Sequence, residues 1–153
     1  MTTANPEQHG GSRTAKQLSR AEIEDILKRN CWGVLAMVDD GTPYSVPIIY
    51  GYNGEDFVFA NGPGKKLDVL MQNPRVNLVV TEVEESGKRW RSVVIKGTVE
   101  WIEELTGKLS AFNTLRKQVP FSAERVRDAA KLASAKVARI VPHEITGRSA
   151  GGQ

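Results

Sequence analysis

The spacing of hydrophobic residues divides the chain into a helical start, a strand-rich centre over 32–101 and a mainly helical end. At the start, apolar residues at helical spacing predict a helix that begins near Ser19 and ends near Asn30. Ser19 and Glu22 have the spacing of a capping box, which favours a helix start at this point. We expect this amphipathic helix to cover one end of a sheet.

The centre has the alternation and the turn signals of consecutive strands. Apolar and β-branched runs over 32–38, 43–52 and 56–60 are separated by Asp39-Asp40-Gly41 and by Asn53-Gly54. Both connections are typical of tight turns between antiparallel strands. The short connections therefore predict three strands in a meander.

A glycine-rich break then leads into a short helix and two further strands. Residues 65–72 have helical spacing, and the helix is expected to end before Pro74, because the residue preceding a proline disfavours helical backbone. Residues 76–81 and 90–101 are predicted as strands, with Gly97 as a bulge or kink in the longer one.

The last third of the chain is predicted to hold helices over 103–118 and 122–135 and a final strand over 136–141. The total is about six strands and four helices, and most strands are consecutive. Long helical crossovers between successive strands are missing, which disfavours a parallel doubly wound sheet. The pattern predicts a mainly β fold, an antiparallel barrel with flanking helices.

Composition fits one domain. The chain has 153 residues, of which 40% are hydrophobic and 25% charged, and it holds no apolar run of about eighteen residues that would span a membrane. We expect one domain over 17–147, with mobile tails over 1–16 and 148–153. The polar N-terminus is unlike a secretory signal, and the lone Cys31 excludes a disulfide framework. A cytoplasmic location is expected.

The chain is poor in residues that carry catalysis themselves. His9, His143 and Cys31 have the wrong number and spacing for a metal centre or a catalytic triad, so neither metal ligands nor catalytic side chains are predicted. The net charge of +3 is compatible with nucleic acid or with a phosphorylated cofactor, but no nucleic-acid-binding motif accompanies it. If the protein is an enzyme, a bound cofactor is expected to supply the chemistry.

Two stretches have the chemistry of an anion site. In the first, a strand ends in Asn61-Gly62-Pro63-Gly64 and Lys65 and Lys66 then open a helix. Glycines allow close approach of the backbone, a helix start presents free N–H groups, and the lysines add charge, so this stretch is a candidate phosphate cradle. A plain turn with solvated lysines is the alternative.

The second stretch is Arg91-Ser92, at the start of the long predicted strand. An arginine and a serine in this position can bind a phosphate or the edge of a flavin. A surface cation is the simpler interpretation of Arg91. Trp32, Trp90 and Trp101 are interpreted as core or dimer-interface residues rather than as ring-stacking ones.

Four groups of segments occur in a fixed order: Gly33–Ala36 with Gly41–Tyr50, Phe57–Asn61 with Gly64–Leu67 and Asn73–Val76, Trp90–Gly97, and Ile145–Arg148. In this order and spacing they resemble the pyridoxamine 5′-phosphate oxidase-like FMN-binding split barrels, over about residues 20–148. The last segment is most similar to the nitroimidazole-resistance branch, whose members include nitroimidazole reductases.

The resemblance implies a six-stranded antiparallel split barrel of Greek-key topology that forms a homodimer with two FMN sites at its interface. It also implies a set of cofactor contacts. These are Val46, Pro47, Ile48 and Ile49 along the isoalloxazine ring, Ala60 and Asn61 near the ribityl chain, Lys65 and Lys66 at the phosphate, and Arg91 and Ser92 at the flavin, across from the partner subunit.

The chain also departs from these relatives. True pyridoxamine phosphate oxidases carry an arginine and a lysine at the ends of the ring-binding strand, where this chain has Ser45 and Tyr50, and their substrate-binding C-terminus has no counterpart here. Nitroimidazole-resistance proteins carry a histidine just after the third strand, but at this place the present chain has Phe59–Gly62, which contains no histidine. Oxidation of pyridoxamine phosphate is therefore disfavoured, nitroimidazole reduction is a hypothesis about the branch, and F420 or haem are alternative cofactors.

The leading hypothesis is an FMN-dependent oxidoreductase, akin to flavin reductases and nitroreductases, that transfers electrons from a reduced nicotinamide to a small-molecule acceptor. The alternative is a non-catalytic split-barrel protein that binds a flavin, F420 or haem. A nucleic-acid-binding barrel ranks third, because only the basic net charge supports it.

Overall fold

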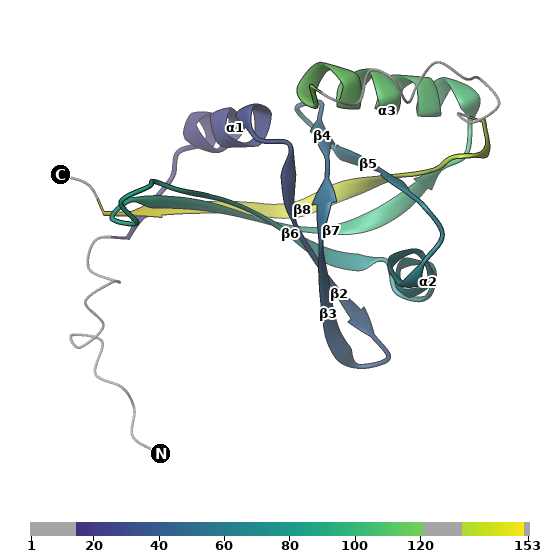
Figure 1. The fold of residues 1–153 in the computed structure, drawn as a ribbon, viewed down its shortest axis with the longest axis horizontal. Helices are drawn as coiled ribbons and strands as arrows, with labels where there is room; N and C mark the ends of the chain where they lie inside the picture. The colour runs from purple at the N-terminus through teal and green to yellow at the C-terminus, as the bar shows by residue number, and fades with distance from the viewer. Residues whose placement is uncertain (1–14, 121–132, 152–153) are drawn as a thin grey trace.

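The computed structural model describes residues 15–120 and 133–151. Within them, a curled antiparallel sheet is flanked by helices (Figure 1). In chain order the elements are β1 (Lys16–Gln17), α1 (Arg20–Arg29), β2 (Trp32–Asp39), β3 (Thr42–Ile49), β4 (Gly51–Tyr52), β5 (Phe57–Asn61), α2 (Lys65–Gln72), β6 (Arg75–Val83), β7 (Trp90–Ile102), α3 (Leu105–Gln118) and β8 (Lys136–Ala150).

The strands follow the order β3-β2-β6-β7-β8-β5-β4, with β1 paired to β8. Every pairing is antiparallel. The run β6-β7-β8-β5 has the order of a Greek key, with α3 inserted between β7 and β8. Because β1 and β4 have two residues each, the remaining six strands carry the barrel. The predicted antiparallel split-barrel fold is confirmed.

The sheet closes at Tyr50. Strands β3 and β4 stand at opposite ends of the strand order, yet only Tyr50 separates them in the chain. Its N–H donates to the Cys31 carbonyl at 2.9 Å and its fully buried phenol donates to the Leu27 carbonyl at 3.0 Å. The strand predicted over 43–52 is therefore two strands joined by a corner, because pairing on the β2 side ends at Tyr50 and pairing with β5 begins at Gly51.

Two apolar clusters stabilise this arrangement. The larger one fills the inside of the barrel with alternate side chains from the curled strands and with the buried face of α1, including Ile26, Leu27, Tyr50, Phe57 and Phe59. The smaller one lies beneath α3 and consists of Val58, Ile102, Ala111, Leu115, Val119 and Val137. Since Val58 lies between Phe57 and Phe59, strand β5 is buried on both faces.

The first helix begins as its sequence predicts. The Ser19 hydroxyl accepts from the Glu22 N–H at 3.2 Å, and the Glu22 carboxylate accepts from the Ser19 N–H at 3.2 Å. These hydrogen bonds, first that of the Ser19 backbone, hold the pKa of Glu22 below its usual range. The capping box and the helix between Ser19 and Asn30 are confirmed.

The bulge predicted at Gly97 is also present. The register between β7 and β8 shifts between Lys96 and Gly97. A Cβ atom at Gly97 would lie 2.6 Å from the Val141 carbonyl oxygen, so the strands approach more closely here than any side chain permits.

The last strand is much longer than predicted. Strand β8 continues from Lys136 to Ala150 and pairs along β7 as far as the Trp90–Ala150 pair. The prediction of a mobile tail is therefore wrong for residues 148–150, and also for Lys16, which pairs with Ser149 in β1. Pairing with β7 holds this polar stretch in the sheet, although its sequence lacks the apolar alternation that predicts a strand.

Other predictions fall partly outside the described residues. The tails over 1–14 and 152–153 do so, and so does most of the helix predicted over 122–135, of which only residues 133–135 are described. No helix among the described residues is long and apolar enough to cross a lipid bilayer.

The side chain of Gln118 joins the ends of two helices to the corner. Its Oε1 accepts from the Tyr52 N–H at 2.7 Å, and its Nε2 donates to the carbonyls of Leu27 and Asn30 at 2.7 and 2.5 Å. Residues 91 and 88 positions apart are thereby tied together. The C-termini of α1 and α3 meet at this amide.

Replacing this amide tests its contribution to stability. We expect Gln118→Met to lower the free energy of unfolding by about 2–4 kcal/mol, because the thioether keeps the length of the side chain but loses three partly buried hydrogen bonds. Denaturant unfolding followed by circular dichroism measures the change. Gln72→Met, on the exposed end of α2, is the matched control and should change stability by less than about 0.5 kcal/mol. Equal effects of the two variants would contradict the role of Gln118.

Candidate functional site

The predicted phosphate cradle lies where β5 passes into α2. Strand β5 ends at Asn61, and the turn through Gly62-Pro63-Gly64 leads to the first helical residue, Lys65. Gly64 has a φ of 152°, a value that side chains rarely permit, and no side chain caps the helix start. The first N–H groups of α2 are therefore open to an anion from outside the helix.

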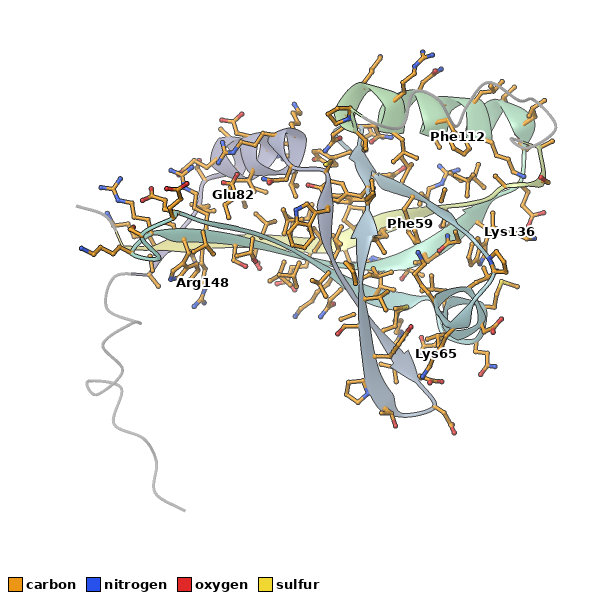
Figure 2. All side chains as sticks on the ribbon, in the orientation of Figure 1. Phe59, Lys65, Glu82, Phe112, Lys136 and Arg148 are labelled. Carbon is orange, nitrogen blue, oxygen red and sulfur yellow. The ribbon has the colours of Figure 1, made fainter. Side chains whose placement is uncertain are left out.

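Lys65 is held by the β2–β3 hairpin. Its ammonium lies 3.4 Å from the Asp39 carboxylate and 4.7 Å from the centre of the Tyr44 ring. Figure 2 shows Lys65 between α2 and this hairpin. Both partners of the ion pair are well exposed, so the pair contributes little and Lys65 can turn toward a ligand at small cost.

Lys66 has a different environment. Its side chain is half-buried, with the ammonium 5.5 Å from the centre of the Phe59 ring. Burial lowers the pKa of Lys66, and no carboxylate among the described residues pairs with it. A half-buried cation without a counterion favours the binding of an anion, because the anion would restore the lost solvation.

Asn61 is the second unbalanced polar group. It is only 8% exposed, and neither its amide nitrogen nor its carbonyl oxygen has a hydrogen-bond partner. It follows Phe57 and Phe59 at a spacing of two, so it belongs to the face of β5 that looks into the barrel. Ala60 is exposed on the other face. An unpartnered buried amide costs free energy, and such groups in native proteins call for a partner.

The four predicted ring-binding residues of β3 divide between two faces. Ile48 is 5% exposed and Val46 packs against the same core, whereas Pro47 and Ile49 lie outside the barrel. The alternation of a strand causes this division. Only the backbone and the outer two side chains are available to a bound ring.

Those outer residues belong to an apolar patch, here called the open face. Trp32 and Ile49 pair across β2 and β3 and are 57% and 42% exposed, and Val34 pairs with Pro47. The patch continues through Val79 on β6 and Val94 on β7. The sequence indicates this patch, since both the odd-numbered and the even-numbered positions of residues 32–38 lack polar side chains. A strand that is apolar on both faces needs cover on both.

Arg91 and Ser92 lie far from the lysines and on opposite faces of β7. Ser92 shares the open face with Thr81, whose hydroxyl is 3.5 Å away. Arg91 lies on the α1 side and pairs in register with Ser149, next to Arg148. Figure 2 shows Arg148 and Lys65 at well-separated parts of the molecule. The structure thus brings Asn61, both lysines and β3 together, and it leaves Arg91 and Ser92 apart from them within one chain.

Beside Arg91 the structure holds a cavity of about 610 Å³, here called the arginine groove, between the end of α1 and the ends of β6, β7 and β8. Its lining residues are Arg29, Glu82, Val83, Glu84, Arg89, Trp90, Arg91, Ser149, Ala150 and Gly151. Sequence reasoning missed it, because Arg29 and Glu82 are 53 positions apart and only the folded chain joins them.

The Arg29–Glu82 pair forms one wall of this groove. The guanidinium donates through Nε at 2.7 Å and through a terminal nitrogen at 2.5 Å, and the Asn30 amide adds a bond at 2.9 Å. The hydrogen bonds with Arg29 hold the pKa of Glu82 below its usual range and raise the pKa of Arg29. This bidentate pair is firmly set and balanced in charge.

Comparison with known proteins places the fold in a family. Residues 19–149 match the family described as pyridoxamine 5′-phosphate oxidase. A crystal structure of an FAD-binding protein from Mesorhizobium loti is 32% identical, with a TM-score of 0.72, over 90% of this chain and 99% of the other.

Two more distant structures share the fold. One is a putative 5-nitroimidazole antibiotic resistance protein from Bacteroides thetaiotaomicron, 23% identical with a TM-score of 0.72 over 90% of this chain and 89% of that one. The other is an FAD and haem binding protein from Mycobacterium smegmatis, 24% identical with a TM-score of 0.75 over 90% of this chain and 74% of that one. With a match that spans residues 19–149, this chain belongs to the pyridoxamine 5′-phosphate oxidase family.

Proposed function

We propose that the protein binds FMN at the cradle of Asn61, Lys65 and Lys66 and works as an oxidoreductase between a reduced nicotinamide and a small acceptor. The observation that carries the proposal is the pair of unbalanced groups at the cradle. Asn61 is a buried amide without a partner, and Lys66 is a half-buried cation without a carboxylate. Both would be satisfied by a phosphorylated polar ligand.

The phosphate fits the lysine end of the cradle. The uncapped start of α2, with Gly64 as its N-cap, and the two ammonium groups favour negative charge. Lys66 would be the stronger contact, since its half-buried ammonium has no carboxylate partner among the described residues, whereas Lys65 is well exposed to water. The Asn61 amide and the backbone of Ala60 would then meet the ribityl chain, whose hydroxyls can both donate to and accept from an amide.

The ring would lie along the outer side of β3. Pro47 and Ile49 offer an apolar surface there, and the backbone over Val46–Ile49 offers polar atoms at the edge. The flavin supplies hydride and electron transfer, and the protein supplies binding, orientation and exclusion of water. No side chain is proposed as a catalytic residue.

The relatives support a flavin more firmly than they support FMN in particular. The 32%-identical protein from Mesorhizobium loti is named as FAD-binding, and the structure from Mycobacterium smegmatis as binding FAD and haem. A non-catalytic binder of a flavin, F420 or haem is the second candidate. It is favoured by the absence, among the described residues, of a titratable partner for Lys66 that would serve as an acid or base.

We also propose that the protein is a cytoplasmic homodimer that joins through the open face. The exposed side chains of Trp32, Val34 and Ile49 form a contiguous apolar surface over paired strands, which is typical of a subunit interface. A second copy on this surface would bring the partner's Ser92 toward the cradle. Arg91 would stay on the α1 side.

Absorption spectroscopy tests the function first. Purified protein is measured before and after addition of FMN, and mass spectrometry identifies any released cofactor. Flavin bands with FMN released, followed by oxidation of a nicotinamide in the presence of nitro or quinone acceptors, are the expected results. Flavin-loaded protein without turnover on any acceptor would favour the non-catalytic alternative, and failure to bind any flavin would overturn both flavin proposals.

Lys66→Ala is expected to weaken FMN binding by about ten- to hundredfold, because it removes a charge-assisted contact from a half-buried position. Titration calorimetry gives the dissociation constant. Lys117→Ala, at an exposed position of α3, is the matched control and should leave the affinity unchanged. An unaltered FMN affinity in Lys66→Ala would show that Lys66 is only a surface cation.

Asn61→Leu is expected to separate stability from binding. In the ligand-free protein it should raise the free energy of unfolding by about 1–3 kcal/mol, because an unpartnered buried amide is replaced by an apolar group of similar size. Its FMN affinity should fall. Asn113→Leu, exposed on α3, should change neither quantity appreciably. A destabilised Asn61→Leu variant with unchanged FMN affinity would argue for a purely structural role.

Val34→Glu is expected to convert the dimer into a monomer, since it places a charge at the centre of the open face, where it would be buried without a partner. Sedimentation velocity measures the mass in solution. Leu109→Glu on α3 adds the same charge at a similarly exposed leucine outside the open face and should leave the dimer intact. A monomeric wild-type protein would refute the proposed dimer directly.

A further inference from the structure

The arginine groove has the size and the charge of a second ligand site. Its volume of about 610 Å³ lies within the range of small-molecule sites, roughly 300–1,000 Å³. It lies against the ends of β6 and β7, whereas the cradle lies at the start of α2. None of its lining residues belongs to the cradle or to the ring-binding strand.

The groove contains an arginine without a fixed partner. Arg29 is committed to Glu82 through two short hydrogen bonds. Arg89 reaches Glu84 at 3.9 Å, and both side chains are more than half exposed, so that contact is weak. The Arg91 guanidinium forms no ion pair with a carboxylate of another described residue.

Arg91 nevertheless acts on its surroundings electrostatically. After the larger effect of the Arg29 hydrogen bonds, its charge contributes to the low pKa of Glu82. It does the same for Glu22, after the hydrogen bonds from Ser19. The carboxylates of Glu82 and Glu22 already accept hydrogen bonds from Arg29 and from the Ser19 N–H, which leaves the fork of Arg91 free to bind a planar anion or a phosphate in a bidentate manner.

The remaining lining matches the other half of a nucleotide. Trp90 lines the groove at the start of β7 and is partly exposed. The Glu84 carboxylate can accept hydrogen bonds from ribose hydroxyls. We propose that the arginine groove binds a phosphorylated nucleoside, with Arg91 and Arg89 at the phosphates and Glu84 at the ribose.

The choice of nucleotide rests on the proposed function. Two molecules in flavin chemistry carry an adenosine diphosphate group: FAD, as the cofactor itself, and a reduced nicotinamide dinucleotide, as the electron donor. Both present the same phosphates and base to the groove. ADP alone is therefore the probe, because it carries the shared chemistry without a flavin or a nicotinamide.

Titration calorimetry of the full-length protein with ADP tests the site. One ADP should bind per chain, and Arg91→Ala should weaken binding by about ten- to hundredfold. Arg75→Ala, at the opposite end of β6 and outside the groove, is the matched control and should bind ADP as the wild type does. Absence of ADP binding to the wild type, or equal binding to both variants, would overturn the proposal.

Two further measurements keep the result specific. Arg91 is exposed, so its truncation should leave the thermal midpoint unchanged, and Arg91→Lys should recover part of the affinity through charge without the fork. Inorganic pyrophosphate should bind more weakly than ADP. Equal affinity for the two would overturn the nucleoside part of the proposal and leave a simple anion site.

The affinities for FAD and FMN show which molecule supplies the nucleotide that the groove binds. If the groove holds part of FAD, Arg91→Ala should weaken FAD binding and leave FMN binding unchanged. If it holds the donor, both flavin affinities should persist while the KM for the reduced nicotinamide rises. The two proposals fail separately: lost flavin binding with ADP still bound in an Arg91-dependent way refutes the cradle, and the reverse result refutes the groove.

Discussion

The corner at Tyr50 is the constraint on which the architecture depends. An antiparallel sheet leaves two unpaired edges, and here the chain turns at one residue so that β3 and β4 end the strand order on opposite sides. The phenol of Tyr50 and the amide of Gln118 both donate to the Leu27 carbonyl. The end of α1 and the end of α3 are thereby fixed against the closed barrel, and burial raises the pKa of Tyr50, which keeps its phenol neutral as a donor.

Closure also decides which side chains reach a ligand. Because neighbouring residues of a strand face opposite ways, Ile48 fills the barrel while Ile49 lies on the open face. The same rule separates Ser92 from Arg91 and assigns them to different surfaces. Arg91 and Ser92 are neighbours in the sequence, but in the fold each of them lies among residues from different, distant strands.

The charges of the molecule fall into two kinds. The Arg29–Glu82 pair is closed by bidentate geometry and serves to hold α1 against the end of the sheet. Lys66 and Arg91 lack such partners among the described residues, and Lys66 bears the cost of burial as well. Lys66 is therefore better explained by a ligand than by stability, since removing this half-buried cation would relieve the cost of its burial in the ligand-free protein.

The sequence by itself determined the features that depend on neighbours in the chain: the capping box of Ser19 and Glu22, the tight turns, the bulge at Gly97, and the glycine-lysine cradle. The antiparallel barrel class followed from the succession of strands, and the split barrel and its family from the order of several short motifs. Only the tertiary structure decided the break at Tyr50, the extension of β8 to Ala150, the isolation of the Asn61 amide and the arginine groove. The physical reason is that each of these depends on hydrogen bonds, burial or charge between segments far apart in the chain, which local periodicity does not record.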